Sequence, residues 1–208
     1  MSKDIAIEVL KYLDFNDGVY FSAGAQDGLF QSNTVILERA KNWTGILVEP
    51  SPAAYSACLK NRSQEKNIII HGALVSADYG KPTIMGDFFG HPMNSIGGKR
   101  LNNAGNSVIE VPAYTMNEIL EKYNVEKIDF LSLDTEGFEY WILKDLNFEK
   151  WAPKWAMIEW NIGEDELFPF MESKGYECIG NISQFTVEDD PGYQNLHQDF
   201  LFKLKDNK

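Results

Sequence analysis

The sequence predicts an α/β fold in which a doubly wound, mostly parallel sheet of about seven strands ends in an antiparallel hairpin. Over most of the chain, short apolar runs alternate with segments of helical character, an order typical of parallel strands joined by crossover helices. Most of these runs are apolar at consecutive positions, as expected for strands covered on both faces. The last two runs are joined by a loop without room for a crossover helix, so they should pair antiparallel.

The chain begins with a helical segment, residues 1–14. Ile5, Val9 and Leu13 recur there at helical spacing and predict a helix over residues 3–13. Apolar runs of strand character follow. Those predicted as strands of the parallel sheet cover residues 19–23, 45–48, 67–75, 128–133 and 155–160.

Helix starts between these runs are marked by capping residues. Ser51 and Pro52 combine a hydroxyl that can cap free amides with a proline whose fixed φ suits a first turn. Thr115 and Glu118 have the spacing of a capping box, which predicts a helix to about residue 123. A further helix is expected from Gly137 onward.

The predicted hairpin consists of residues 176–182 and 196–204, with Asp189-Asp190-Pro191-Gly192 in the loop between them. Residues 81–106 differ from the rest of the chain because they carry five glycines and show little periodicity. Loops of this length are usually lids or binding loops. We therefore expect a mobile flap, or substrate loop, beside the site.

Length and composition indicate one cytoplasmic domain. The 208 residues, 44% of them hydrophobic, suffice for one well-buried core and are few for two full domains. The formal charge of −12 would repel a phosphate backbone, so nucleic acid is not an expected partner. Two distant cysteines fit a reducing compartment. Because no apolar run approaches membrane-spanning length, no membrane association is expected.

A glycine turn follows the first predicted strand, in VYFSAGAQDGLF. Gly24 and Gly28 would let the backbone approach a ligand closely. Their G-x-x-x-G spacing lacks the middle glycine of the dinucleotide fingerprint, which disfavours a nicotinamide-dependent oxidoreductase. Glu49 closes the second strand, where an acid can accept hydrogen bonds from ribose hydroxyls. The pattern favours a nucleoside without a demanding phosphate site; an ordinary tight turn is the alternative.

Acidic residues follow two later strands. Asp134 and Glu136 come directly after IDFLSL, and Glu159 ends the next strand. In a parallel sheet they would share an edge with Gly24 and Glu49. They could deprotonate a substrate hydroxyl or bind a divalent metal, although Glu136 could instead cap the following helix and Glu159 could be a solvated strand end. His197, on the last strand, is a further candidate base.

Several blocks resemble a known family in their order along the chain. YFSAGAQDGLFQSNTVILERAKNWTGILVEPSPAAYSACLKNR is similar to the opening of the FkbM family of S-adenosylmethionine-dependent methyltransferases, and IDFLSLDTEGFEYWIL is similar to that family's second signature. With VPAYTMNEIL and AMIEW, the resemblance covers roughly residues 18 to 204. A match in several ordered blocks is more specific than a lone glycine turn. It implies a Rossmann-like domain with S-adenosylmethionine as its cofactor.

The resemblance also implies roles for particular residues. The segment from Ser22 to Gly28, with Asn33 on the helix after it, would hold the methionine part of the cofactor. Glu49 would hold the ribose, and Gly72, Ala73 and Leu74 would flank the adenine. The implied cofactor-binding set is Ser22, Gly24, Ala25, Gln26, Asp27, Gly28, Asn33, Glu49, Pro50, Ala73 and Asp134.

The predicted function is methyl transfer to a hydroxyl of a sugar or another small polar metabolite, with Asp134, Glu136, Glu159 and His197 as candidate catalytic residues. The family usually has an acidic residue at the position of Ser22. Its absence keeps open the alternative of a catalytically silent, nucleoside-binding scaffold. The sequence leaves the metal requirement, the acceptor and the oligomeric state open.

Overall fold

The computed structural model describes residues 5–88, 108–161, 165–183 and 197–206. The strands in these residues are β1 (Val19–Ala23), β2 (Thr44–Glu49), β3 (Asn67–His71), β4 (Ala73–Leu74), β5 (Thr83–Asp87), β6 (Val108–Tyr114), β7 (Phe130–Leu133), β8 (Trp155–Asn161), β9 (Tyr176–Asn181) and β10 (His197–Leu204). The helices there are α1 (Ile5–Leu10), α2 (Val35–Lys41), α3 (Pro52–Asn61), α4 (Met116–Lys122), α5 (Glu139–Lys144), α6 (Phe148–Trp151) and α7 (Leu167–Ser173), with a 3₁₀ turn η1 (Ala77–Tyr79).

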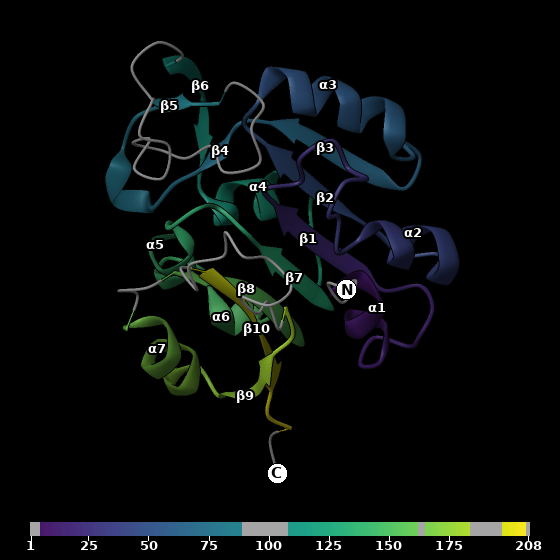
Figure 1. The fold of residues 1–208 in the computed structure, drawn as a ribbon. Coiled ribbons are helices and arrows are strands. Elements are labelled where there is room, and N and C mark those ends of the chain that lie inside the picture. Colours follow the sequence, from purple (N-terminus) through teal and green to yellow (C-terminus); the bar gives the residue numbers. More distant parts are fainter. Residues whose placement is uncertain (1–4, 89–107, 162–164, 184–196, 207–208) are drawn as a thin grey trace, which may run out of the picture.

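Within the described residues, the main sheet has seven strands in the order β3-β2-β1-β7-β8-β10-β9 (Figure 1). The pairs from β3 to β8 are parallel, and β10 is antiparallel to both β8 and β9. This confirms the predicted mostly parallel sheet with a C-terminal antiparallel hairpin. The chain fills one half of the sheet outward from β1 and then begins the other half at β7. Strand order therefore reverses between β1 and β7, the position at which open α/β sheets bind ligands.

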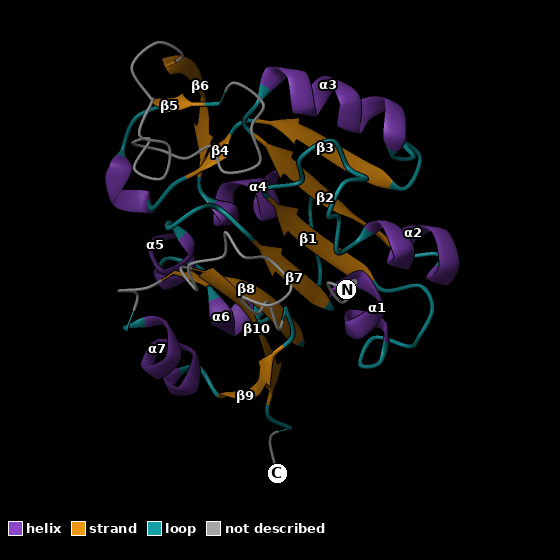
Figure 2. Ribbon diagram, in the orientation of Figure 1, coloured by secondary structure: helices purple, strands orange, loops and turns teal. Residues whose placement is uncertain are grey.

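Helices cover both faces of this sheet (Figure 2). Alternate residues of β1 enter different cores: Tyr20 packs with Val9 of α1, Leu37 of α2 and Cys58 of α3. Phe21 and Ala23 belong to the other core, to which α4, α5, α6 and α7 contribute. This alternation is the pleat of a strand buried on both faces, as the consecutive apolar residues predicted.

Two predicted helix starts are confirmed by their caps. The Ser51 hydroxyl accepts a hydrogen bond from the Ala54 amide at the start of α3. At α4, Thr115 and Glu118 form both bonds of the capping box. The opening helix ends earlier than predicted, since α1 (Ile5–Leu10) stops three residues before Leu13. No helix in the described residues is both long enough and apolar enough to cross a bilayer.

The run predicted as one strand over residues 67–75 is two strands, separated at Gly72. β3 stays in the main sheet, whereas β4 pairs with β6 in a second sheet of order β4-β6-β5. A side chain at Gly72 would meet the Tyr114 ring at 2.6 Å and the Pro112 carbonyl oxygen at 2.8 Å. The glycine therefore allows the chain to leave one sheet and pass directly against a strand of the other.

The prediction of a flap over residues 81–106 is wrong in its first part, because residues 83–87 are the strand β5. β5 pairs antiparallel with β6, and Ile84 and Phe88 are buried in a small third core with Val111. The periodicity is weak because Gly86 occupies a buried position of β5. Residues 89–107 of the predicted flap lie outside the described residues.

Candidate functional site

A cavity lies at the carboxyl ends of β1, β2 and β7, beside the reversal of strand order. It contains about 980 Å³ of empty space, counting the part that is open to solvent. The residues predicted for the cofactor or for catalysis that line it are Ser22, Gly24, Ala25, Gln26, Asn33, Glu49, Pro50, Ala73, Asp134 and Glu136. The predicted residues thus come together from five separate parts of the sequence.

The glycine turn is shaped by the chain itself. Gly24 has a φ of 76°, and a Cβ there would lie 1.9 Å from the backbone oxygen of Asp134. The amides of Gly24 and Ala25 both donate to the Val48 carbonyl. Gly24 therefore lets the end of β1 approach the end of β7. Because Gly24 also lines the cavity, the interpretation that it lets the backbone approach a ligand stays a prediction.

Asp27 and Gly28 do not line the cavity, although both were predicted to bind the cofactor. The Asp27 carboxylate accepts the amides of Leu29 and Phe30 at 2.8 and 2.7 Å, so it caps the turn. A Cβ at Gly28, whose φ is 77°, would meet the Arg62 side chain at 2.7 Å and the Cys58 sulfur at 2.9 Å. Both residues therefore shape the turn from behind.

Asn33 lines the cavity, but it lies in the turn before α2 and not on a helix as expected. Its side-chain amide donates to the Ser132 hydroxyl of β7 at 3.4 Å. The chain remains irregular from Gly24 to Thr34, and Gln26 and Gln31 take positive φ values. One wall of the cavity is therefore a long turn.

Glu49 is held in place by two backbone amides. One carboxylate oxygen accepts from Gln26 at 2.7 Å and the other from Ser51 at 2.8 Å. The side chain is buried, and burial raises the pKa of Glu49 to about 7, although the two amides act in the opposite direction. A carboxylate offers about four lone-pair positions. Each oxygen therefore keeps one position for a donor from the cavity, as a ribose diol would supply.

Carboxylates crowd together where β7 and β8 end. Carboxylate oxygens of Asp134, Glu139 and Glu159 lie within 4.8 Å of one another. Two full negative charges at that separation repel by roughly 3 kcal/mol at an effective dielectric constant of about 20. Burial, followed by the charges of the surrounding acids and chiefly Glu159, raises the pKa of Asp134 well above its ordinary value. The ionised form of Asp134 is therefore disfavoured relative to that of an ordinary aspartate.

Asp199 joins this group from β10, where it is the register partner of Glu159. Burial, and then the charge of Glu159, raises the pKa of Asp199 to about 7, against a hydrogen bond from Ser183. His197 begins the same strand opposite Asn161, and its side chain lies outside the described residues. The predicted acids Asp134 and Glu159 are thus brought together, while a role for His197 stays a prediction.

Glu139 organises the turn between β7 and α5. Its carboxylate accepts three hydrogen bonds, from the amide and hydroxyl of Thr135 and from the amide of Gly137. Glu136, between them, takes a left-handed φ of 59° and lines the cavity. Glu139 therefore holds the turn that precedes α5, and no side-chain hydrogen bond is made at the N-cap of this helix. The alternative that the charge of Glu136 caps the helix stays a prediction.

The same three carboxylates, from Asp134, Glu139 and Glu159, are a candidate set for a metal ion. Both oxygens of Glu139 already bind the turn. Asp134 lines the cavity and Glu159 lies on the neighbouring strand β8, so these two are the candidate contacts for an ion. Two carboxylates with water are a ligand set that Mg²⁺ accepts.

Sequence reasoning missed several cavity residues. Phe30 and Phe88 face the cavity as aromatic walls, and Ser132 and Thr135 add hydroxyls beside Asp134. Ser132 could have been found, because it is the register partner of Ser22 and both are small polar residues in otherwise apolar strands. Phe88 gave no such signal, since it belongs to the segment predicted as a flap.

Comparison with protein families identifies the methyltransferase FkbM domain over residues 22–178. That match spans about three quarters of the chain. No curated protein sequence matches the chain at a significant level.

Solved structures share the fold at low sequence identity. The human methyltransferase 10 domain containing protein is 9% identical with a TM-score of 0.55, over 98% of this chain and 83% of that one. A Streptococcus pneumoniae protein, described as a candidate tRNA methyltransferase and solved with S-adenosyl-L-methionine, is 11% identical with a TM-score of 0.54, over 100% and 75% of the two chains. A Streptococcus agalactiae protein of the NADB-Rossmann superfamily is 12% identical with a TM-score of 0.54, over 100% and 70%. At such identities these likenesses show the fold, which confirms the Rossmann-like prediction.

Proposed function

The chain belongs to the FkbM methyltransferase family, and from that premise we propose that it transfers the methyl group of S-adenosylmethionine to a hydroxyl oxygen of a small polar acceptor, of the sugar class. One observation carries the proposal. A cavity with a nucleoside-compatible acid, Glu49, on one side has a crowded set of acids around Asp134 on the other. The first can hold a cofactor, and the second can receive the proton that a hydroxyl loses on methylation.

The residues present fit the cofactor. Glu49 offers its two remaining acceptor positions toward the cavity, and Ala73 and Leu74 form an apolar wall beside it. Ribose hydroxyls that donate to Glu49 would favour its ionised form, so binding should release a proton near pH 7. Ser22 contributes a hydroxyl where the family usually has an acid. Bound S-adenosylmethionine would supply an electrophilic methyl group on a sulfonium ion.

Asp134 is the residue proposed to handle the proton. It lines the cavity, and its high pKa means that its ionised form is a strong proton acceptor. Glu159 and Asp199, behind it, would tune that basicity by charge. Alignment of the acceptor should supply much of the remaining acceleration, with Glu136 and the Ser132 and Thr135 hydroxyls near enough to the cavity to orient it.

A divalent metal is a second way in which Asp134 and Glu159 could lower the pKa of the acceptor hydroxyl. Metal-assisted and metal-free transfer are separated by comparing rates in EDTA and in Mg²⁺ or Mn²⁺. A rate that falls at least 100-fold in EDTA and returns with the metal would assign the ion to these two carboxylates. An unchanged rate would favour metal-free transfer, in which Asp134 accepts the proton of the hydroxyl.

Two other functions need separate tests. A nucleic acid acceptor has a precedent in the Streptococcus pneumoniae protein, which is described as acting on tRNA, but the net charge of −12 disfavours such an acceptor here. A silent scaffold would bind the cofactor and transfer nothing.

The experiment uses S-adenosylmethionine labelled in its methyl group, with hexoses, deoxyhexoses and their nucleoside-diphosphate derivatives as acceptors and total tRNA in parallel. Label in a sugar ether, lost in Asp134→Asn and kept in Asp129→Asn, supports the proposal. Asp129 is a matched control because it is a buried carboxylate beside β7, but it precedes the strand, whereas Asp134 follows it. Label in tRNA would show that the acceptor is RNA and not a sugar. Cofactor binding without methyl transfer to any acceptor would favour the catalytically silent scaffold.

A further inference from the structure

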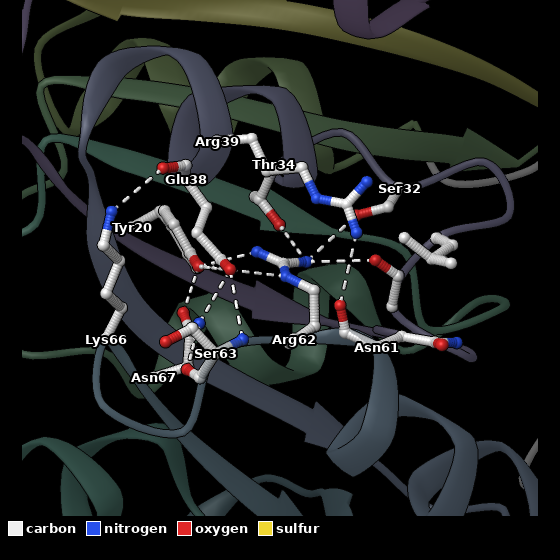
Figure 3. A network of polar contacts seen from close by, with 12 residues as sticks. Tyr20, Ser32, Thr34, Glu38, Arg39, Asn61, Arg62, Ser63, Lys66 and Asn67 are labelled. Carbon is white, nitrogen blue, oxygen red and sulfur yellow. Dashed lines mark hydrogen bonds and ion pairs between the residues drawn. The ribbon is translucent and has the colours of Figure 1, made fainter.

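Behind the cavity wall lies a buried polar network centred on Arg62, the residue that follows α3 (Figure 3). The Arg62 side chain is fully buried and forms an ion pair with Glu38 of α2 at 2.6 Å. Such a pair is costly to desolvate and is retained only when further hydrogen bonds satisfy it. The positions of those further bonds show what the network holds.

Most of them go to the irregular turn that forms the cavity wall. One Arg62 nitrogen, Nη1, donates to the Gly28 carbonyl at 3.3 Å and to the hydroxyls of Ser32 and Thr34 at 3.2 Å each. The other, Nη2, donates to the Tyr20 hydroxyl of β1 at 2.6 Å. The neighbouring Asn61 donates to the Asp27 carbonyl at 2.8 Å. The end of α3 is therefore tied to both ends of residues 27–34.

This turn has little support of its own. It contains neither helix nor strand, and its other hydrogen bonds are mostly local, such as those of the Asp27 carboxylate with the Leu29 and Phe30 amides. Yet its residues from Phe30 to Asn33 line the cavity. A binding wall that is already ordered avoids the entropy of ordering it on binding. The guanidinium, anchored by Glu38 and Tyr20, supplies that order from outside the cavity.

We propose that Arg62 is a positioning residue for the cofactor: it holds residues 28–34 in the geometry that S-adenosylmethionine binds. It does so without touching the ligand, because Arg62 itself does not line the cavity. Lysine cannot replace it, since one ammonium group cannot reach Glu38, Tyr20 and the turn together as a planar guanidinium does. The inference rests on the proposed function, because it assumes that this cavity binds the cofactor.

The test compares Arg62→Lys with Asp129→Asn. Asp129 is the matched control because it is also buried, accepts the Val19 amide and pairs with Lys127 and Lys154, but at the far end of β1 and β7. Urea unfolding first establishes the conditions under which each variant is folded. Each variant is then titrated with S-adenosylmethionine under those conditions. Amide hydrogen exchange is measured for residues 28–34 in the absence of ligand.

For Arg62→Lys we expect the Kd for S-adenosylmethionine to rise at least tenfold and the amides of residues 28–34 to lose protection selectively. For Asp129→Asn we expect lower stability with a Kd within about twofold of the parent. Thr34→Val provides a second variant in case Arg62→Lys does not fold: it removes one acceptor on the turn and leaves the Arg62–Glu38 pair in place. It should weaken binding about threefold in the same direction.

Unchanged binding in a folded Arg62→Lys, or in Thr34→Val if Arg62→Lys does not fold, would overturn the inference and leave the proposed function intact. Equal loss of binding in Asp129→Asn would also overturn it, since stability alone would then explain the effect. A parent protein that binds neither S-adenosylmethionine nor S-adenosylhomocysteine would overturn the proposed function, and this inference with it.

Discussion

Strand β7 has an aspartate beyond each end, and the two have opposite surroundings. Asp129, before the strand, is fully buried and meets Lys127, Lys154 and the Val19 amide. Burial alone would raise the pKa of Asp129, but these partners together bring it below its ordinary value. Asp134, after the strand, is surrounded by other acids, and its pKa is raised. The four residues of β7 therefore separate a carboxylate whose charge is compensated by lysines from one that is surrounded by other acids.

The same division holds elsewhere in the chain. Glu38 is buried with Arg62, whose hydrogen bond and charge, with the Ser63 amide and Asn67, outweigh burial and lower the pKa of Glu38. Glu49 and Asp199, which lie near the cavity, have pKa values raised to about 7. Burying acids without cations is costly, and perturbed acids of this kind concentrate at functional sites. The contrast therefore separates carboxylates that stabilise the fold from those that serve the site.

The largest expected effect comes from exchanging one carboxylate at each end of β7. Asp134→Asn should lower the rate of methyl transfer at least 100-fold, as loss of a general base does, with no loss of stability. Asp129→Asn should lower the free energy of unfolding by about 2 kcal/mol, because hydrogen bonds to a charged group are lost, and keep the rate. Single-turnover transfer and urea unfolding measure the two effects. Similar effects of both variants on the rate and on the free energy of unfolding would contradict the division between a catalytic and a stabilising carboxylate.

The pH dependence of stability should also have two limbs. Asp199 keeps its proton in the folded protein up to about pH 7 but loses it near pH 4 when unfolded. The folded state therefore binds more protons in that window, and the stability from Asp199 is lost as pH rises through about 7. Asp129 and Glu38 act oppositely: their pKa values are lowered, so their contribution is present above about pH 4 and is lost below it.

Asp199→Asn should therefore raise the free energy of unfolding at pH 8 by about 4 kcal/mol, at about 1.4 kcal/mol for each unit of the pKa shift, and change it little at pH 4, where the side chain is protonated in the folded protein. Urea unfolding at both pH values measures this, with Asp165→Asn, an exposed turn position, as the control. A gain of equal size at both pH values would show that the benefit does not come from titration of Asp199.

The smallest expected effect lies in the turn after Asp134. Glu136 has a φ of 59°, so Glu136→Gly should stabilise the protein by about 1 kcal/mol. We expect the rate of transfer to fall less than tenfold, because Glu136 acts on Asp134 by its charge. Glu136→Gln, which removes the charge and keeps the strain, is the control. A fall as large as that of Asp134→Asn would assign the proton to Glu136 instead.

The sequence predicted the parts of the fold and site that depend on local pattern. Buried parallel strands have consecutive apolar residues, and Glu49 and Asp134 come at the ends of such runs. Their common position at the carboxyl ends of the parallel strands could therefore be predicted from the sequence. Arg62 and Glu38 could not be found this way. Arg62 stands in the polar run KNRSQEK, and Glu38 is a charged residue in the middle of α2. Neither position indicates burial, and both residues are buried because α2, α3 and β1 meet in the folded protein. The strand β5 was missed for a related reason: its packing partner, β6, lies more than 20 residues along the chain.

The most direct test of the proposed function is a calorimetric titration of the protein with S-adenosylmethionine and S-adenosylhomocysteine, at pH 6 and pH 8. It is repeated with Glu49→Gln and with Glu110→Gln, an exposed acid on β6, as the control. We predict micromolar binding, about −8 kcal/mol, that is tighter at pH 8 because Glu49 must ionise, and that is weak and independent of pH in Glu49→Gln alone. Absence of heat and of thermal stabilisation with either ligand would contradict this prediction and the cofactor assignment with it.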